Sequence, residues 1–104
     1  MKGFTPYYAV IFTSIRKDVD HEAYTNMAIK MEQLAQQQPG FLHVDSARNE
    51  VGITVSYWES LEAIKQWKQQ ADHIIAQKIG IQKWYSYYHT RICKVEREYD
   101  FHAV

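Results

Sequence analysis

One continuous stretch, residues 52–80, constrains the fold most, because it passes from strand periodicity to helix periodicity without a linker. Ile53, Val55 and Tyr57 fall at every second position, as in a strand with one buried face. Ser60 then offers a side chain that caps the amino terminus of a helix. The apolar residues that follow are spaced as on one helix face: Leu61, Ile64, Trp67 and Ala71. The segment therefore predicts a strand and the helix that covers it.

The end of this segment predicts how the covering helix stops and what comes after it. We expect the helix to restart at Asp72 after a kink and to end at Gly80, because glycine accepts the backbone conformation of a helix end. Residues 81–88 are predicted as a further helical turn. The last strand is predicted over about 89–99, where β-branched residues alternate with charges as in an edge strand.

The first half of the chain also predicts a strand followed by a helix, and then a further strand. Residues 7–15 are rich in aromatic and β-branched side chains on both alternating faces, which indicates a strand covered on both sides. A helix with a single apolar stripe follows and stops at Pro39-Gly40. Residues 41–48 predict a second strand, and the short connection over 49–52 joins it to the third as an antiparallel hairpin.

The predicted order is strand, helix, strand, strand, helix, strand, which is the βαββαβ, ferredoxin-like arrangement of the α+β class with an antiparallel sheet. A chain of 104 residues forms one domain, here residues 1–104 with a core over about 7–99. Both helices would cover one face of the sheet. The other face is apolar and stays bare in a monomer, so we expect a second copy to cover it in a homodimer.

Composition excludes several classes of partner. Twelve basic and twelve acidic residues give a formal net charge of zero, which disfavours nucleic acid. No apolar run approaches the roughly 20 residues needed to span a membrane. Cys93 is the only cysteine, which suits a reducing compartment, so the cytoplasm is the expected location. The five histidines show no metal-binding spacing, and we expect no metal site.

Aromatic residues make up 14% of the chain, which favours either an interface or a cavity lined by rings. Trp67 is then a wall for a flat ligand or a core side chain between helix and sheet. His73 is a base for a phenolic substrate or a solvent-exposed histidine. Tyr57, Tyr87 and Arg91 supply phenols and a cation to the mouth of the pocket, or are packed rings and a surface charge.

Several segments together resemble one known family. The turn Gln38 to Phe41 (QPGF), the junction Gly52 to Ser60 (GITVSYWES) and the tryptophan on the next helix are similar to the antibiotic biosynthesis monooxygenase family, whose members are dimeric α+β barrels. The resemblance covers residues 7–99. It implies the fold and the pairing of two chains more specifically than the chemistry, because relatives include cofactor-free oxygenases of aromatic polyketides, haem-degrading enzymes and proteins without known activity.

At the level of residues, Trp67 matches a tryptophan that the haem-degrading and quinone-forming members keep facing the pocket. His73 falls where the polyketide oxygenases have a tyrosine. Gln77 stands where the haem degraders have their iron-binding histidine, and the first strand lacks the asparagine that they use. These two departures from the pattern of the haem-degrading members argue against haem chemistry, and we expect no cofactor.

Two functions follow as expectations. The first is a cofactor-independent monooxygenase acting on a small planar aromatic compound, with His73 as the base and Trp67 as the wall. Such a reaction needs no cofactor, because a deprotonated, electron-rich substrate can itself reduce oxygen, and the protein supplies a base, a dry cavity and positioning. The alternative is a non-catalytic small-molecule-binding or stress-related dimeric barrel protein, since one fold serves many functions.

Overall fold

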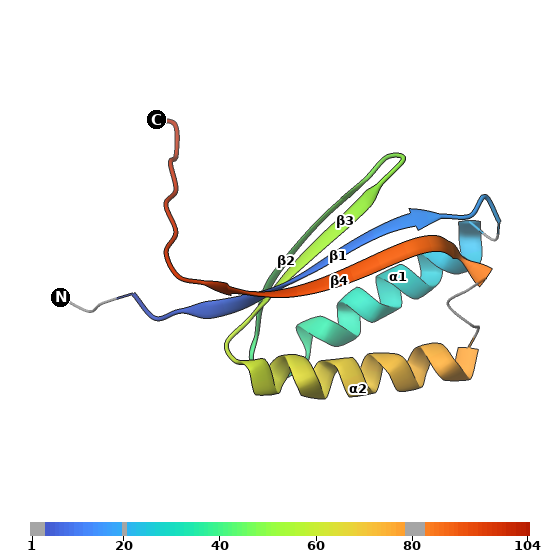
Figure 1. The fold of residues 1–104 in the computed structure, drawn as a ribbon, viewed down its shortest axis with the longest axis horizontal. Helices are drawn as coiled ribbons and strands as arrows, with labels where there is room; N and C mark the ends of the chain where they lie inside the picture. Colours follow the sequence, from blue (N-terminus) through green and yellow to red (C-terminus); the bar gives the residue numbers. More distant parts are fainter. Residues whose placement is uncertain (1–3, 20, 79–82) are drawn as a thin grey trace.

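A computed structural model describes residues 4–19, 21–78 and 83–104, with the backbone alone for 73–78. Its four strands form one antiparallel sheet in the order β2-β3-β1-β4. Figure 1 shows both helices on one side of this sheet. The predicted α+β, ferredoxin-like βαββαβ fold is thereby confirmed. The elements are β1 (Tyr7–Arg16), α1 (His21–Gln36), β2 (Phe41–Arg48), β3 (Gly52–Trp58), α2 (Leu61–Lys78) and β4 (Tyr85–Val95).

The register of the strands decides which side chains face the helices. Tyr8 and Val10 of β1 pack against the core that the helices supply, so the even-numbered residues of β1 point to the helix side. Their partners across the ladder point the same way. Ala9 and Ile11 point to the opposite side, which we call the helix-free face. Alternation therefore divides the strands between a helix side and the helix-free face, with shifts at Ile15/Arg16 and at Phe41/His43, where the register is irregular.

The buried core lies around Trp58, at the end of the sheet where α2 begins. The Trp58 side chain is fully buried, and its indole N–H donates to the Ser56 hydroxyl over 2.9 Å. Phe41 meets it edge-on at 5.4 Å, and Trp67 stacks on it at 6.1 Å between ring centroids. A tryptophan of β3 thus fixes α2 on the sheet through a tryptophan of the helix itself.

Helix α2 confirms one sequence expectation and corrects another. Its first turn is capped by Ser60, whose hydroxyl accepts a hydrogen bond from the Ala63 amide over 3.1 Å, as predicted. The expected kink at Asp72 is wrong, because α2 runs without a break through this position. Asp72 pairs instead with Lys68 one turn earlier at 2.9 Å, the i,i+4 arrangement that supports a continuous helix.

No helix among the described residues is both long enough and apolar enough to span a bilayer.

Strand β4 begins at Tyr85 and not at the predicted His89, and it ends at Val95. Residues 85–88 form strand because they pair with the far end of β1, where Arg16 lies opposite Tyr85 and Ile15 opposite Tyr87. Pairing supplies backbone hydrogen bonds that an isolated helical turn would lack, and cross-strand ring contacts add to them. The long β1·β4 ladder therefore overrides the local pattern.

Gly40 lies in the turn between α1 and β2, and replacing it tests the geometry of that turn. Its φ is +85°, and a Cβ atom added there would lie 2.6 Å from the Cβ of Ala63. We expect Gly40→Ala to lower the free energy of unfolding by about 2 kcal/mol, since it combines a left-handed backbone with a steric clash. Urea denaturation measures this loss. In an Ala63→Gly background, which removes the clashing Cβ, Gly40→Ala should cost less than it does in the wild type. No loss in the single variant would contradict the described turn.

Candidate functional site

A cavity of about 590 Å³ lies between the two helices and the helix side of the sheet. Its volume falls within the range of small-molecule sites, about 300–1,000 Å³. The sheet and both helices contribute to its largely apolar wall, which includes Val10, Phe12, Met27, Met31, Trp67 and Ala71. The arrangement suits a flat, mostly apolar ligand, because aromatic and methionine side chains present broad, adaptable surfaces.

Trp67 belongs both to the core and to the cavity. One side of the indole stacks on Trp58 with 22° between the ring planes, and the residue also lines the cavity. The two alternatives that the sequence left open for Trp67 are therefore compatible. The contact with Trp58 holds the ring in place, so the wall of the cavity is rigid before any ligand enters.

The far end of the cavity carries a polar cluster drawn from β1, α1, β2 and β4. The Arg48 guanidinium donates through Nη2 to the hydroxyl of Ser14, which is fully buried, and to the hydroxyl of Tyr24 over 3.4 Å. The hydroxyls of Tyr24 and Tyr85 also lie 3.4 Å apart. We call Ser14, Tyr24, Arg48 and Tyr85 the Arg48 cluster.

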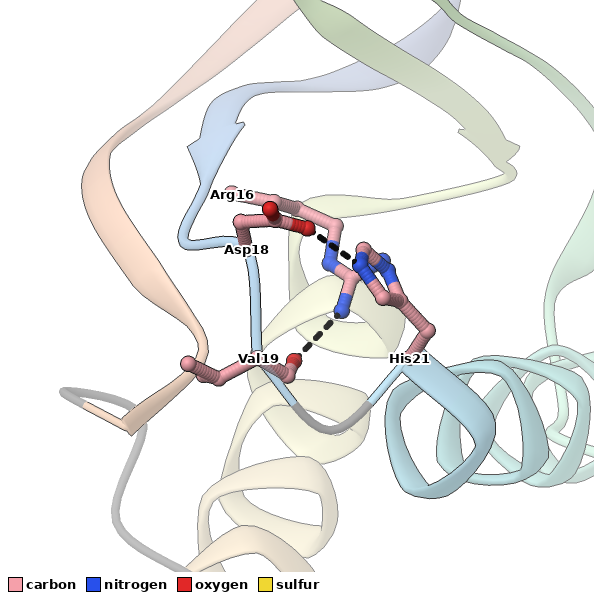
Figure 2. Close-up of polar contacts among 4 residues, drawn as sticks. All are labelled: Arg16, Asp18, Val19 and His21. Atoms are coloured by element: carbon pink, nitrogen blue, oxygen red, sulfur yellow. Dashed lines mark hydrogen bonds and ion pairs between the residues drawn. The ribbon is translucent and has the colours of Figure 1, made fainter.

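A second arginine adjoins this cluster. The guanidinium carbon of Arg16 lies 3.7 Å from the ring centroid of Tyr24, within the range of a cation–π contact. Arg16 also donates to the Val19 carbonyl over 3.2 Å and to Nδ1 of His21 over 3.1 Å (Figure 2). His21 in turn contacts the Asp18 carboxylate at 2.6 Å. These contacts fix the Arg16 guanidinium at the turn before α1.

The pKa of Tyr85 is raised above that of a free tyrosine. Burial of the phenol is the main cause, and the hydrogen bond to Tyr24 adds to it, while the charges of Arg48 and Arg16 act in the opposite direction. At neutral pH the Tyr85 phenol is therefore protonated and can donate a hydrogen bond. It is a poor choice for a base.

Three further charged residues line the cavity away from this cluster. They are Glu32 of α1 and the ion pair Lys68–Asp72 of α2. Asp72 places a carboxylate on the wall of the cavity that Trp67 also lines. Among the described side chains, no three of His, Cys, Asp and Glu converge in a way that would hold a metal ion.

The structure separates the residues that the sequence nominated. Trp67 lines the cavity, whereas the side chains of His73 and Gln77 lie outside the described part of the chain. Tyr57, Tyr87 and Arg91 do not line it.

These last three residues lie on the helix-free face, so their expected place at the pocket mouth is corrected. Strand alternation is the cause, because Tyr57 pairs with Ala9 and Arg91 pairs with Ile11, both of which point away from the helices. Tyr57 stacks there on His43 at 6.1 Å between ring centroids. Any contact of these residues with a ligand would be made on that face.

Sequence reasoning missed the Arg48 cluster. One signal for it was present in β2, where Val44, Ser46 and Arg48 occupy alternate positions and so share a face. All three line the cavity. Tyr24 and Tyr85 carried no comparable signal, because their meeting depends on how α1 packs and on where β4 begins.

Comparisons with known proteins agree with this architecture. The sequence profile described as antibiotic biosynthesis monooxygenase matches residues 6–78. The uncharacterized protein YqjZ of Bacillus subtilis is 45% identical over 95 residues, covering 89% of this chain and 82% of its own length.

Solved structures share the fold at low sequence identity. PA3566 from Pseudomonas aeruginosa is 15% identical with a TM-score of 0.69, covering 93% of this chain and 100% of its own. A mutant of SnoaB, a cofactor-independent oxygenase from Streptomyces nogalater, is 9% identical with a TM-score of 0.69, covering 91% of this chain and 97% of its own. Such identities establish a common fold and nothing finer. The profile match over residues 6–78 shows that this chain belongs to the antibiotic biosynthesis monooxygenase family.

Proposed function

We propose that this protein is a cofactor-independent monooxygenase acting on a small planar aromatic compound in the cavity beside Trp67. The observation that carries the proposal is the cavity itself, about 590 Å³ in volume and walled by aromatic and methionine side chains on the helix side of the sheet. The similarity in fold to SnoaB, a cofactor-independent oxygenase, supports it.

The reaction we propose balances without an external reductant. An anthrone loses a proton to a base and becomes an electron-rich anion, which transfers electrons to O2. Its CH2 carbon becomes a carbonyl that contains one oxygen atom, and the other oxygen atom leaves as water. The protein has to hold the ring, accept the proton and keep bulk water from the anion. Trp67 holds the ring.

The base in this proposal is His73, because an imidazole titrates near neutral pH and can both accept and release the proton. Its neighbour Asp72 carries one of the two described carboxylates on the cavity wall, on the same helix as His73, and it is the alternative base to be tested. If the base were Asp72, removal of that carboxylate would stop the reaction while replacement of His73 would not.

The proposed assembly is a homodimer closed through the helix-free face. That face exposes large apolar side chains in the single chain, including Ile15, Ile53 and Tyr87, each at least 40% exposed. Covering them removes apolar area from water, which is the main driving force for association. We place the dimer in the cytoplasm, because the exposed, unpaired thiol of Cys93 suits a reducing compartment.

Oxygen uptake with anthrone tests the function. We expect wild-type protein to consume one O2 for each anthrone oxidised, and His73→Gln to lower the rate at least about 100-fold, the usual contribution of a general base. His102→Gln, a change in the exposed tail, is the matched control and should leave the rate unchanged. Asp72→Asn is measured in parallel.

The outcomes separate the alternatives. Uptake that survives His73→Gln and disappears in Asp72→Asn would reassign the base. Saturable binding of hydroxyquinones and anthrones without any uptake would reject the oxygenase. It would favour a small-molecule-binding or stress-related protein that uses the same cavity.

A further inference from the structure

The Arg48 cluster contains more hydrogen-bond donors than acceptors. An arginine side chain carries five N–H donors and no acceptor. Arg48 uses Nη2 on the hydroxyls of Ser14 and Tyr24, and its remaining N–H groups have no partner among the described residues. Tyr85 donates its phenolic proton to the Tyr24 hydroxyl over 3.4 Å, which leaves the O–H of Tyr24 as a further donor. A group that completes the hydrogen bonds of this cluster must therefore be an acceptor.

Buried donors next to the cluster indicate the same need. Trp84 lines the cavity and is only 3% exposed, yet its indole N–H has no hydrogen-bond partner among the described residues. The Nε–H of Arg16 is also buried and has no partner in the same part of the chain. Leaving a buried donor unsatisfied is unfavourable, so a ligand or an ordered water is the expected partner of such a group.

The charge at this end is positive and uncompensated. The guanidinium carbons of Arg16 and Arg48 lie 3.7 and 5.7 Å from the ring centroid of Tyr24. Among the described residues neither arginine forms an ion pair with a carboxylate. Asp18, two residues from Arg16, is bound to His21, and Glu50, two residues from Arg48, forms no ion pair with it among the described residues.

The acidic residues of the cavity wall do not neutralise these two arginines. Asp72 is paired with Lys68 on α2. Glu32 follows Tyr24 by eight residues on α1, which places it about 12 Å further along the helix at 1.5 Å per residue. The Arg48 guanidinium therefore lines the cavity end without a negative partner among the described residues, and the Arg16 guanidinium lies over the ring of Tyr24 beside it.

We propose that the Arg48 cluster binds the carboxylate of an acidic aromatic ligand whose ring extends along the cavity toward Trp67. The inference rests on the proposed function in that it takes the same cavity as the ligand site. A carboxylate can accept charge-assisted bonds from the N–H groups of Arg48 other than those on Nη2, and a further bond from the Tyr24 phenol. The ligand class is thus narrowed from planar aromatic compounds to planar aromatic acids.

Binding under nitrogen tests the inference without turnover. Isothermal titration compares 1-hydroxy-2-naphthoate with its primary amide, which has nearly the same shape and no charge. We expect wild-type protein to bind the acid at least about tenfold more tightly, the ratio that one charge-assisted hydrogen bond supplies. Arg48→Gln should remove this preference, because it should weaken the binding of the acid and leave the binding of the amide unchanged. Arg97→Gln removes an exposed arginine beyond β4 and should leave the preference intact.

Each result decides the inference. Equal affinities in the wild type, no measurable binding of the acid, or a preference that persists in Arg48→Gln would overturn it. The wild-type comparison does not depend on the folding of a variant, and circular dichroism checks Arg48→Gln. A preference for the acid without oxygen uptake would reject only the oxygenase, whereas oxidation of neutral anthrones without that preference would reject only the carboxylate site.

Discussion

Replacing Trp58 by alanine is expected to remove about 3–5 kcal/mol from the free energy of unfolding. The side chain is fully buried, and it contacts Phe41 from β2 and Trp67 from α2. Its loss opens a hole at the place where sheet and helix are joined. Small domains have about 5–15 kcal/mol of stability in total, so the variant should unfold at a much lower urea concentration.

Trp58→Phe separates packing from hydrogen bonding in this core. It keeps most of the apolar area and removes the N–H that donates to Ser56 over 2.9 Å. We expect a smaller loss, about 1–2 kcal/mol. A Trp58→Ala variant as stable as the wild type would contradict the placement of the core.

Replacing Ile11 by lysine is expected to separate the proposed dimer into monomers. Ile11 lies in β1 on the helix-free face, between Val55 of β3 and Arg91 of β4. A lysine here would be buried in the interface beside a second cation, which is unfavourable because neither charge gains a partner. We expect the dissociation constant of the dimer to rise at least about 100-fold, equivalent to about 3 kcal/mol. Sedimentation velocity over a range of concentrations measures the change.

Leu61→Lys is the matched control for this change. It introduces the same charge at an apolar residue that is 54% exposed at the start of α2, away from the helix-free face. The control should sediment as the wild type does. A wild-type protein that is monomeric at all concentrations would contradict the proposed pairing of the two sheets.

The fold was predictable because its signals are local. Alternation over Ile53, Val55 and Tyr57 defines β3, and the helical spacing after Ser60 defines α2, so each element is visible within a few residues. One error occurred where a tertiary contact decides: Tyr85 joins a strand because Arg16 is there to pair with it. The error at Asp72 was local, because an i,i+4 pair with Lys68 supports a continuous helix where the pattern after Ala71 indicated a kink.

The candidate site was predictable only in part, for the same physical reason. Trp67 could be nominated because it lies on the apolar stripe of one helix. The Arg48 cluster could not, since it joins side chains from four elements that meet only after the sheet has its register and α1 has packed. Alternation shows that Tyr57 and Ile53 share a face, but it does not say which face the helices cover.

Intermolecular NOEs between protons of 1-hydroxy-2-naphthoate and the protein test most directly whether the cavity on the helix side of the sheet is the ligand site. We expect NOEs from the naphthalene ring to the indole of Trp67 and to the methyl groups of Met27 and Met31, all of which line the cavity. NOEs to the rings of Tyr57 or Tyr87 on the helix-free face would contradict that site, as would their absence from Trp67 at saturating ligand.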